Sequence, residues 1–597
     1  MIASFTRTKK LREAMKKAGI DIYVMVNSDP HESEYLPDYW KSVEWLTGFR
    51  GEVATVILTQ TEALLWTDSR FFISGAQQLK GSPFQLMKMK IDIPAVEWLK
   101  ARKKEKGKGD NETEELHIGG DKRVIFGPIS DLIQKDADLI TPLWKNRPAL
   151  PDGKIFLYGD EYNGETAASK LARILEAIDA PSGHALLLSA LDDIAWTLNL
   201  RGSDIHCTPV FTSYLLLSQG LKALFVDEGK VTPEVRSYLA TLQVEIRPYG
   251  EAPIHEQEIT VGNETARLDA SNPVPLMKAI KNEVEIAGYR KAMLKDGIAL
   301  TRFYHWLEEK LTSVGEFVMN PDGSIGISNE VTELDCVEKL KEYRQEQAGY
   351  MDESFDAIVA WNEHGALPHY EPRPETNVPI TGDGLLLIDT GGHYLEGTTD
   401  ITRTIGVGQV SAAMKRDYTL VLKGHINLAQ AVFPRGTRGD QIDALARIFL
   451  WRDGKTYRHG TSHGVGHYLG VHEGPESVRM EHNPQVLLEG MFFSNEPAIY
   501  LGGKYGIRHE NCVLVRPFDV DIDSPGATPC DQEEHGDFLC LDTLTLCYID
   551  TSCVDLNIMN SEEIAWLNQY NQWVYDTLAP HLEEMDRLWL GTKCQPL

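Results

Sequence analysis

Four carboxylates and one histidine in the last third of the chain have the chemistry of a metal site. They lie in short segments that we interpret as strands or turns, and they are Asp389, Asp400, His463, Glu496 and Glu510. Four acids gathered around one point cannot all stay ionised in a partly buried site, because like charges repel and desolvation disfavours each charge. A bound cation removes that conflict. Four oxygen donors with one imidazole suit a divalent ion such as Mn²⁺ better than a lone structural zinc, which favours Cys and His.

Each of these acids also has an ordinary structural interpretation. An Asp beside a glycine-rich turn is commonly a turn or capping residue, and two glycines lie between Asp389 and Asp400. A lone glutamate in a strand-like segment is more often a solvated charge, which applies to Glu496 and Glu510. The metal interpretation therefore depends on the whole set and not on any one residue.

Three histidines in the same region, His459, His463 and His467, are four residues apart, a spacing that forms one metal-binding face on a helix. The glycines at 460, 464 and 466 disfavour a helix in this segment. In an extended or looped segment, only one or two of the histidines can face a common point. For His467 we favour an ordinary polar role.

Two predicted strands carry the aspartates. The apolar run 384–388 ends at Asp389, the glycines that follow mark a turn or bulge, and residues 399–407 alternate as a second strand. A hairpin-like pair of these strands places Asp389 and Asp400 side by side. Upstream, apolar residues recur at helical spacing from Ile286 to Leu311, so we expect a long helix that packs one face on the core of the last domain.

The composition favours a soluble cytoplasmic protein. The chain of 597 residues has 59 Lys and Arg against 88 Asp and Glu, a formal net charge of −29, which argues against binding to nucleic acid or to an anionic membrane surface. No stretch is long and apolar enough to span a bilayer, and the first residues lack the apolar core of a signal peptide. The 8 cysteines show no CxxC pairing, so we expect reduced thiols, with late disulfides as the alternative.

A repeated pattern organises the first half of the chain. Residues 45–51 follow the pattern W-x-x-x-[FL]-R-G and precede two apolar runs, and the same order begins again at Trp196. We favour a duplication that gives two related α/β domains; a coincidence of short apolar runs is the alternative. We therefore expect a mixed α/β chain with three domains, at residues 1–155, 156–280 and 281–597. The charged stretch 102–115 and the acidic stretch 517–537 are expected to be solvated loops.

Several longer motifs bring these segments into one known pattern. They include WTDSRFF in the first domain, LDDIAWTLNLRGSDI in the second, and HGALPHY, LLLIDTGGHYLEGTTDITRT, HGTSHGVGHYLGVHEGP, NEPAIY and GIRHEN in the third. In the order and spacing of these motifs the chain resembles the pita-bread metallopeptidases, the group of creatinase, prolidase and methionine aminopeptidase, and most closely the three-domain cytosolic Xaa-Pro aminopeptidases. The resemblance covers nearly the whole chain. It implies two creatinase-like α/β domains followed by a pita-bread catalytic domain.

The resemblance also implies a role for each metal ligand. Asp389 and Glu510 would hold one divalent ion with Asp400 bridging, while Asp400, His463, Glu496 and Glu510 would hold a second. Mn²⁺ is the favoured ion, with Zn²⁺ or Co²⁺ as alternatives. Glu496 matches the position of the general base in the family.

Three further histidines match the other active-site histidines of the family, namely His369, His459 and His472. For them we expect a role in holding the substrate and stabilising the tetrahedral intermediate. Arg508 lies two residues before a ligand, and we expect it either to orient a carboxylate or to form an ordinary strand ion pair.

The function implied by the resemblance is removal of one N-terminal residue from peptides with proline in the second position. A bond to proline is a tertiary amide without an N–H, so peptidases that rely on that donor fit it poorly and a dedicated pocket is needed. A prolidase for Xaa-Pro dipeptides, a metal-free creatinase-type hydrolase and a non-catalytic binding module are the alternatives. In this family the C-terminal region helps to form a dimer, so the aromatic stripe from Trp566 to Tyr575 is expected to be either core or a homodimer interface.

Overall fold

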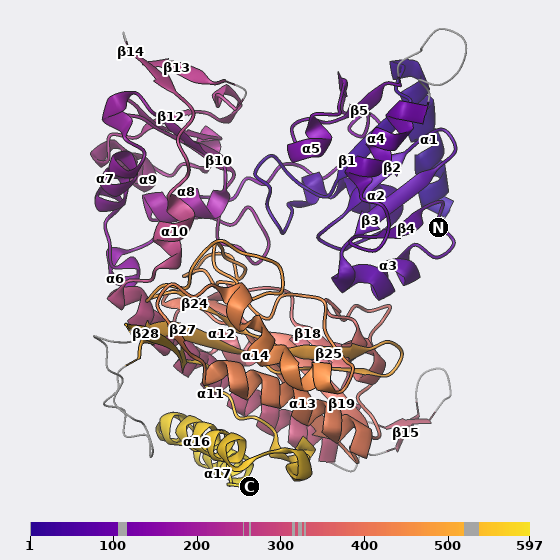
Figure 1. Cartoon of the computed structure of the whole chain (residues 1–597), viewed down its shortest axis with the longest axis vertical. Coiled ribbons are helices and arrows are strands. Elements are labelled where there is room, and N and C mark those ends of the chain that lie inside the picture. Colours follow the sequence, from indigo (N-terminus) through magenta and orange to yellow (C-terminus); the bar gives the residue numbers. More distant parts are fainter. Residues whose placement is uncertain are drawn as a thin grey trace. The chain divides into compact units, whose positions relative to one another are not determined.

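In the computed structural model of this chain, the two copies of the repeated pattern lie in sheets that share the arrangement of four consecutive strands (Figure 1). The first sheet has the order β4 (Gln85–Lys88), β3 (Ala63–Thr67), β2 (Thr55–Leu58), β1 (Ile22–Val26), β5 (Ile118–Gly120) and β6 (Lys135–Asp136). The second has the order β12 (Glu245–Pro248), β11 (Lys222–Val226), β10 (Ser213–Leu217) and β8 (Leu186–Leu188). In both sheets two antiparallel pairs are followed by a parallel pair, β3–β4 in the first and β11–β12 in the second. The expectation of two related α/β domains is therefore confirmed.

The structure describes the whole chain except residues 1, 106–115, 255, 262–263, 313–316, 320–324, 328–329 and 519–535. It forms two units, Met1–Leu157 with Lys170–Asn272, and Tyr158–Ser169 with Pro273–Leu597. The second unit is called the catalytic unit below. Most of the two expected solvated loops lies outside the described residues. The boundaries of the three domains stay a prediction.

Strands β1, β2 and β3 of the first sheet are apolar on both faces because both faces are covered. Tyr23 and Met25 of β1 pack in one hydrophobic cluster, while the alternate residues Ile22 and Val24 pack in another. Continuous apolar runs are typical of strands buried in this way. The helices of this unit are α1 (Ile2–Ala18), α2 (Ser42–Thr47), α3 (Phe72–Gln78), α4 (Ala95–Glu105), α5 (Gly127–Ser130), α8 (Leu191–Leu198) and α9 (Pro233–Thr241), and α7 (Ala167–Ala177) joins the two units.

Four small sheets build the strand layer of the catalytic unit, and β15 (Phe317–Met319) and β16 (Ile325–Ile327) form a separate two-stranded sheet. The strand orders of the four sheets are β18 (Ile358–Trp361), β19 (Gly384–Thr390), β22 (Ile401–Val407); β17 (Tyr350–Glu353), β20 (Gly392–Tyr394), β21 (Gly397–Thr398); β23 (Val432–Pro434), β28 (Phe538–Thr543), β27 (Asn511–Pro517), β24 (Phe492–Asn495); and β25 (Ala498–Leu501), β26 (Tyr505–Arg508). The helices are α6 (Asp160–Asn163), α10 (Val274–Ala279), α11 (Glu283–Thr312), α12 (Glu333–Gln345), α13 (Ala412–Ala429), α14 (Gly439–Arg452), α16 (Ser561–Leu578) and α17 (Glu584–Lys593). The predicted long helix is confirmed as α11.

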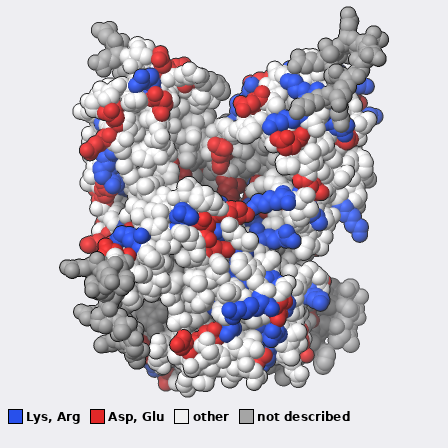
Figure 2. All heavy atoms as spheres, in the orientation of Figure 1, with Lys and Arg blue, Asp and Glu red and all other residues white. Residues whose placement is uncertain are grey.

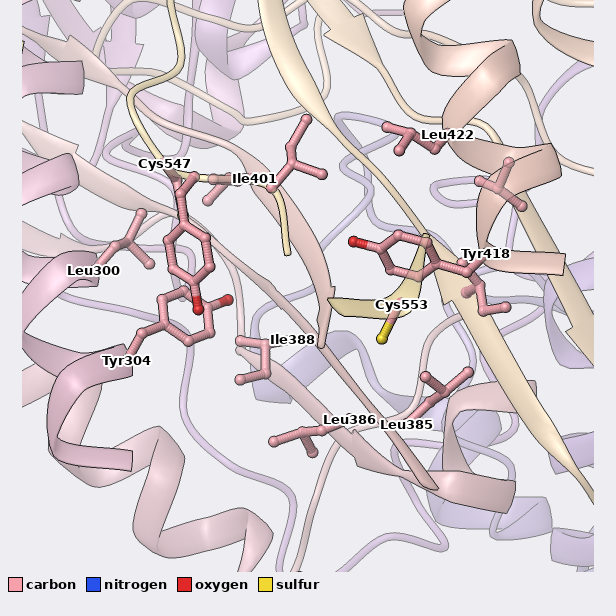
Figure 3. Packing of buried hydrophobic residues seen from close by; sticks show 14 of the residues in the cluster. Leu300, Tyr304, Leu385, Leu386, Ile388, Ile401, Tyr418, Leu422, Cys547 and Cys553 are labelled. Carbon is pink, nitrogen blue, oxygen red and sulfur yellow. The ribbon is translucent and has the colours of Figure 1, made fainter. Parts of the chain in front are cut away.

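The core of the catalytic unit lies between these helices and strands. Leu300 and Tyr304 of α11 pack with Leu386 and Ile388 of β19 and with Tyr418 of α13 (Figure 3). The C-terminal helix α16 adds buried residues to the same cluster, which are Leu567, Tyr570, Val574 and Leu578. One face of the aromatic stripe from Trp566 to Tyr575 therefore belongs to the core, which was the first of its two predicted roles.

A short segment near the start of the expected second domain, residues 158–169, belongs to the catalytic unit. The Tyr158 hydroxyl donates a hydrogen bond of 2.6 Å to the carbonyl of Leu395. At the other end of α6, the side chain of Asn282 donates to the carbonyl of Asn163 at 2.8 Å. Residues 158–169 are thus held by the unit that contains the proposed ligands.

The surface carries charges of both signs. On the face drawn in Figure 2, both Lys and Arg side chains and Asp and Glu side chains are present on each unit. Among the described residues no helix is long and apolar enough to cross a membrane. The 7 cysteines within the described residues form no disulfide and are buried.

Candidate metal centre

The two aspartates lie at neighbouring strand ends. Asp389 belongs to β19 and stands opposite Thr402 of β22, while Asp400 comes directly before β22. The predicted pairing of the two strands is confirmed. The aspartates are not direct cross-strand partners, however, because the chain between them forms a hairpin of its own from β20 and β21.

The other proposed ligands also lie at strand ends or in a loop. Glu496 lies between β24 and β25, and Glu510 lies between β26 and β27. The segment that contains His459, His463 and His467 has no helix, as the glycines predicted. Irregular backbone at these positions lets each side chain turn toward the same region independently of a helical or strand repeat.

Three of the five proposed ligands approach one another closely. Ligand atoms of Asp400, His463 and Glu510 all lie within 4.8 Å of one another. His463 Nε2 is 3.3 Å from Asp400 Oδ2 and 3.4 Å from Glu496 Oε1. Asp389 joins the set through its electrostatic interaction with Asp400. The fold thus brings the five side chains into one buried neighbourhood.

The carboxylates are held in an environment that disfavours their charge. Burial raises the pKa of Asp389 and of Glu510, and repulsion from Asp400 raises each further. Burial also raises the pKa of Glu496 to about 7, against the opposing effect of His463 and Arg508. Asp389 Oδ1 is buried without a hydrogen-bond partner within the described part of the chain. An orphaned oxygen among mutually repelling acids fits a divalent cation, since a cation supplies the missing partner and favours the ionised form.

His463 is oriented for metal binding by its other ring nitrogen. Its Nδ1 donates a hydrogen bond of 2.8 Å to the carbonyl of Gly464, which leaves Nε2 facing the acids. Burial alone would lower its pKa, but the hydrogen bond to Asp400 and the charge of Glu496 outweigh burial and raise the pKa to about 9. A backbone carbonyl on one nitrogen commonly fixes the tautomer of a metal-binding histidine.

Arg508 acts as the positive partner of Asp389. Its guanidinium forms an ion pair with Asp389 and donates to Thr402 Oγ1 at 3.0 Å. The Thr402 hydroxyl in turn donates to Glu510 Oε2 at 2.6 Å. Both interpretations of Arg508 therefore hold: it is paired within the strands, and it orients a proposed ligand.

Tyr500 is a site residue that the sequence did not single out. Arg508 Nη1 donates to its hydroxyl at 2.5 Å, and His459 Nε2 lies 2.9 Å from that hydroxyl. His459 Nδ1 donates to the carbonyl of Gly460, so its Nε2 accepts from Tyr500. Burial and the nearby Arg508 hold the pKa of His459 well below its ordinary value, so the ring is neutral. The register of β25 on β26 explains this contact. Ala498 pairs with Arg508, and Tyr500, two residues after Ala498, lies on the same face of the strand pair.

The remaining proposed histidines lie near the same ligands. The ring of His472 meets that of His463 edge-on, with centroids 4.3 Å apart. His369 is near enough to His459 to contribute to the lowered pKa of that ring. His467 instead contacts the hydroxyl of Tyr158, with its Nδ1 at 3.3 Å, which agrees with the ordinary role expected for it.

Arg403 is a second residue that the sequence did not reveal. Its buried guanidinium donates to the carbonyl of Glu510 at 2.7 Å and to the carbonyl of Cys547 at 2.7 Å. It also donates to the hydroxyl of Tyr570 in α16 at 2.9 Å. One side chain of β22 thereby ties the backbone of a proposed ligand to the C-terminal part of the chain.

The family comparisons agree with this arrangement of fold and site. Models of the creatinase/prolidase N-terminal domain match residues 7–109 and 146–285, and the model of metallopeptidase family M24 matches residues 287–517. The C-terminal region of these peptidases matches residues 537–597. The fold and the site define a metallopeptidase of family M24 that carries two N-terminal domains of the creatinase type.

Individual relatives show which branch of this metallopeptidase family the chain resembles. Aminopeptidase P2 of Arabidopsis thaliana is 34% identical over 640 aligned residues, which cover 97% of this chain and 86% of the relative. A probable Xaa-Pro aminopeptidase P of Laccaria bicolor is 34% identical over 99% of this chain and 93% of its own. The crystal structure of X-prolyl aminopeptidase from Caenorhabditis elegans, described as a cytosolic enzyme with a di-nuclear active site, has a TM-score of 0.87 at 32% identity, with 100% of both chains covered. The chain belongs to the Xaa-Pro aminopeptidase P family.

A second buried group of charges lies beside the histidine segment. Glu473 forms ion pairs with Lys278, at 2.9 Å, and with Lys281. The nearby carboxyl of Glu476 is buried, and neither of its oxygens has a hydrogen-bond partner among the described residues. Burial and the charge of Glu473 raise the pKa of Glu476 to about 7, although Lys281 and Lys278 oppose the rise.

We predict that Glu476→Gln stabilises the protein at pH 8 and leaves its stability nearly unchanged at pH 4. The pKa of Glu476 in the folded chain, about 7, is above its ordinary value of 4.5. The stability that this carboxyl contributes is therefore complete below pH 4.5 and is lost as pH rises through 7. The gain at pH 8 should be about 1–3 kcal/mol, read from urea unfolding at both pH values. The exposed Glu338→Gln is the control, and an equal gain in both variants would contradict the prediction.

We also predict that Asp400→Asn and Glu510→Gln each abolish metal binding at the site, because each change removes a carboxylate charge from the group of ligand atoms that lie within 4.8 Å. Metal content after gel filtration is the measurement. Asp453→Asn, at the C-terminal end of α14, is the matched control and should keep the full metal content. A variant at Asp400 or Glu510 that retained the wild-type metal content would show that the ligand assignment is wrong.

Proposed function

We propose that this protein is an aminopeptidase that uses two divalent metal ions to release the N-terminal residue from peptides with proline second. The observation that carries this proposal is the buried group of Asp400, His463 and Glu510, whose ligand atoms lie within 4.8 Å of one another in a chain of the Xaa-Pro aminopeptidase P family. Asp389 and Glu496 complete the set. A non-catalytic protein has no need of this many repelling acids, since each one costs folding free energy without a cation.

The proposed ligands divide between two metal ions, and the types of their donor atoms indicate which metal they suit. Asp389 and Glu510 would hold one ion together with Asp400, and Asp400, His463, Glu496 and Glu510 would hold the other. Mn²⁺ suits this set because oxygen donors predominate; Zn²⁺ and Co²⁺ are the alternatives. When bound, the two ions polarise the scissile carbonyl and activate a water molecule.

The side chains of the protein position the reactants. Glu496 is the general base, because its carboxyl lies 3.4 Å from His463 Nε2 at the site and matches the position of the base in the family. His369 and His472 hold the substrate and the developing negative charge, while His459, whose Nε2 accepts from Tyr500, holds a substrate group that donates a hydrogen bond. Tyr500 fixes the ring of His459 through its hydroxyl, so a contact from His459 Nε2 to a substrate exchanges one hydrogen bond for another.

The excess of acid also suits the end of the peptide that is cleaved. A free N-terminal ammonium group is positive, so carboxylates near the metal ions attract it and fix the register of the peptide. The proline that follows offers no N–H, so recognition of the second residue relies on shape and on the conformation of the ring.

We predict chelator-sensitive release of the first amino acid from Arg-Pro-Pro by the purified protein loaded with Mn²⁺. Arg-Ala-Ala, which lacks proline at the second position, is the control peptide and should be cleaved at a much lower rate. Amino-acid analysis of the products gives the readout, together with the metal content of the protein. Cleavage of the dipeptide Arg-Pro alone would identify a prolidase, and bound metal without turnover would identify a binding module.

The proposal also includes an oligomeric state, the homodimer, and a location in the cytoplasm. Apolar side chains remain exposed on the two C-terminal helices, with Trp573 36%, Met585 65% and Leu588 58% exposed. A second copy of the chain would cover this surface. The cytoplasmic location rests on the acidic composition and on the cytosolic description of the enzyme from Caenorhabditis elegans, and cell fractionation tests it.

We predict a particle of twice the chain mass of 67.0 kDa in light scattering at micromolar concentration. Leu588→Asp in α17 should shift the mass toward the monomer, because a charge would be buried at the interface without a partner. Leu556→Asp, on an exposed leucine outside α16 and α17, is the control and should leave the mass unchanged. A wild-type protein of monomer mass would contradict the proposal.

A further inference from the structure

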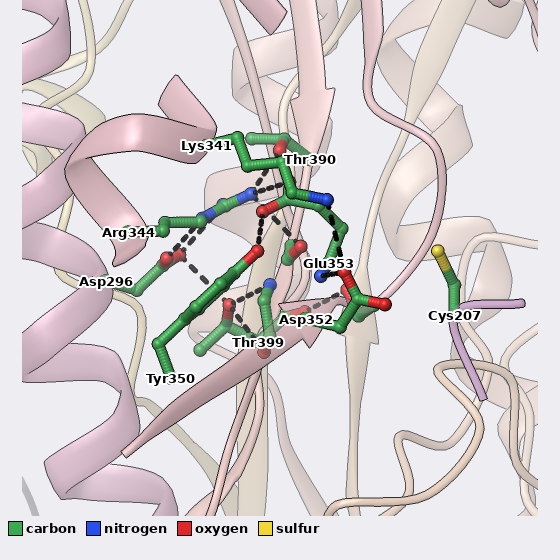
Figure 4. Close-up of polar contacts among 12 residues, drawn as sticks. Cys207, Asp296, Lys341, Arg344, Tyr350, Asp352, Glu353, Thr390 and Thr399 are labelled. Carbon is green, nitrogen blue, oxygen red and sulfur yellow. Dashed lines mark hydrogen bonds and ion pairs between the residues drawn. The ribbon is translucent and has the colours of Figure 1, made fainter. Parts of the chain in front are cut away.

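The hairpin between the two proposed aspartate ligands rests on a buried cluster of charges. Arg344 of α12 is fully buried and donates through Nε to Asp296 Oδ1 of α11 at 2.8 Å. Its Nη1 donates to Glu353 Oε2 of β17 at 2.7 Å. Figure 4 shows these side chains pointing toward one another from the two helices and the strand. The three residues are called the Arg344 cluster below.

The Arg344 cluster touches the hairpin directly at both ends. Arg344 Nη1 also donates to Thr390 Oγ1 at 2.6 Å and to the carbonyl of Gly391 at 3.0 Å. Asp296 Oδ2 accepts from Thr399 Oγ1 at 3.0 Å. Thr390 directly follows Asp389, and Thr399 directly precedes Asp400. One ion pair therefore holds the residue next to each aspartate.

The hairpin has no room to move without breaking these contacts. A Cβ at Gly391 would lie 2.0 Å from the carbonyl oxygen of Thr399 and 2.3 Å from Ser354 Oγ. The amide of Thr399 donates to the carbonyl of Gly392 at 2.9 Å, and the Tyr394 hydroxyl donates to Asp296 Oδ1 at 3.0 Å. The two ends of the hairpin are therefore fixed to each other as well as to the helices.

The charges of the cluster make these contacts strong. Burial alone would lower the pKa of Arg344, but Asp296 and Glu353 outweigh it and hold that pKa well above its ordinary value, so the guanidinium stays charged. Hydrogen bonds from a charged, fork-shaped donor are stronger and more directional than neutral ones. The position of Thr390 is thus set by a rigid donor and not by a flexible surface contact.

We propose that Asp296 and Arg344 are positioning residues that set the separation of Asp389 and Asp400 before metal binds and so determine the affinity of the site for metal. This inference rests on the ligand set of the proposed function. Without the cluster, repulsion between the two carboxylates would spread the hairpin ends, and a cation would have to draw them together again. Outer partners of metal ligands typically change metal affinity by about 10–100-fold.

The test is the dissociation constant for Mn²⁺, measured on the full chain by competition with a fluorescent chelator. Asp296→Asn keeps the size of the side chain and removes its charge, and we expect its dissociation constant to rise by about 10–100-fold. Thr390→Val removes only the hydroxyl that Arg344 holds, and we expect a rise in the same direction. Thr390→Ser restores that hydroxyl and should return the dissociation constant to within about twofold of the wild type.

A buried ion pair elsewhere in the same unit provides the matched control. Lys423 of α13 pairs with Glu563 of α16 and donates to the carbonyl of Ile558, so its polar contacts within the described part of the chain lie away from the hairpin and the proposed ligands. Glu563→Gln should lower the urea midpoint while leaving the dissociation constant for Mn²⁺ unchanged. A cluster with a purely structural role would give the same result for Asp296→Asn.

The outcomes separate this inference from the proposed function. Wild-type affinity in both Asp296→Asn and Thr390→Val, or an equal loss of affinity in Glu563→Gln, would overturn the positioning role alone. A wild-type chain that bound no Mn²⁺ would overturn the ligand set and the positioning role together. Because the readout is metal binding, a wild-type chain that bound Mn²⁺ but did not cleave Arg-Pro-Pro would count only against the proposed function.

Discussion

The four proposed carboxylate ligands repel one another in a buried place, and most polar contacts around them reduce the cost of that repulsion. Arg508 gives Asp389 a positive partner, the hydroxyl of Thr402 donates to Glu510, and His463 lies between Asp400 and Glu496. The raised pKa values of Asp389, Glu496 and Glu510 show that these partners compensate only in part. The remaining cost is what two divalent ions would offset, so metal binding and stability of this unit are linked.

The strands supply the precision that such a site requires. Antiparallel pairing of β19 with β22 and of β25 with β26 fixes the backbone on which Asp389 and Arg508 stand. Arg403 then joins the carbonyl of Glu510 to the C-terminal segment, which packs on α11 through the same hydrophobic core. Side chains distant in sequence therefore hold the backbone of one short ligand segment.

Local sequence patterns predicted the strands and helices whose formation depends on residues close together in the chain. Continuous apolar runs gave the strands of the repeated domains, and helical spacing between residues 286 and 311 gave α11. The glycines around His463 correctly argued against a helix. The site residues could be proposed because four carboxylates and one histidine together suit a divalent ion, and because their motifs match a family.

Other features could not be read from the sequence because their partners are remote along the chain. Asp296 looked like any charged residue of a helix, and only the fold brings it to Thr399. Tyr500 needed the register of β25 on β26. The offset of Asp389 from Asp400 came from the β20–β21 hairpin, whose pairs are too short to predict from alternation.

The Tyr158 contact bears on how the chain can be divided. The carbonyl that accepts from Tyr158 belongs to Leu395, in the turn of the hairpin between Asp389 and Asp400. A fragment that began at the end of the second α/β domain would contain every proposed ligand and still leave that turn without its donor. The catalytic unit is therefore not one continuous stretch of the chain. An expression fragment or gene fusion cut at the apparent domain limit would lack Tyr158, which lies more than a hundred residues before that limit and supports the hairpin.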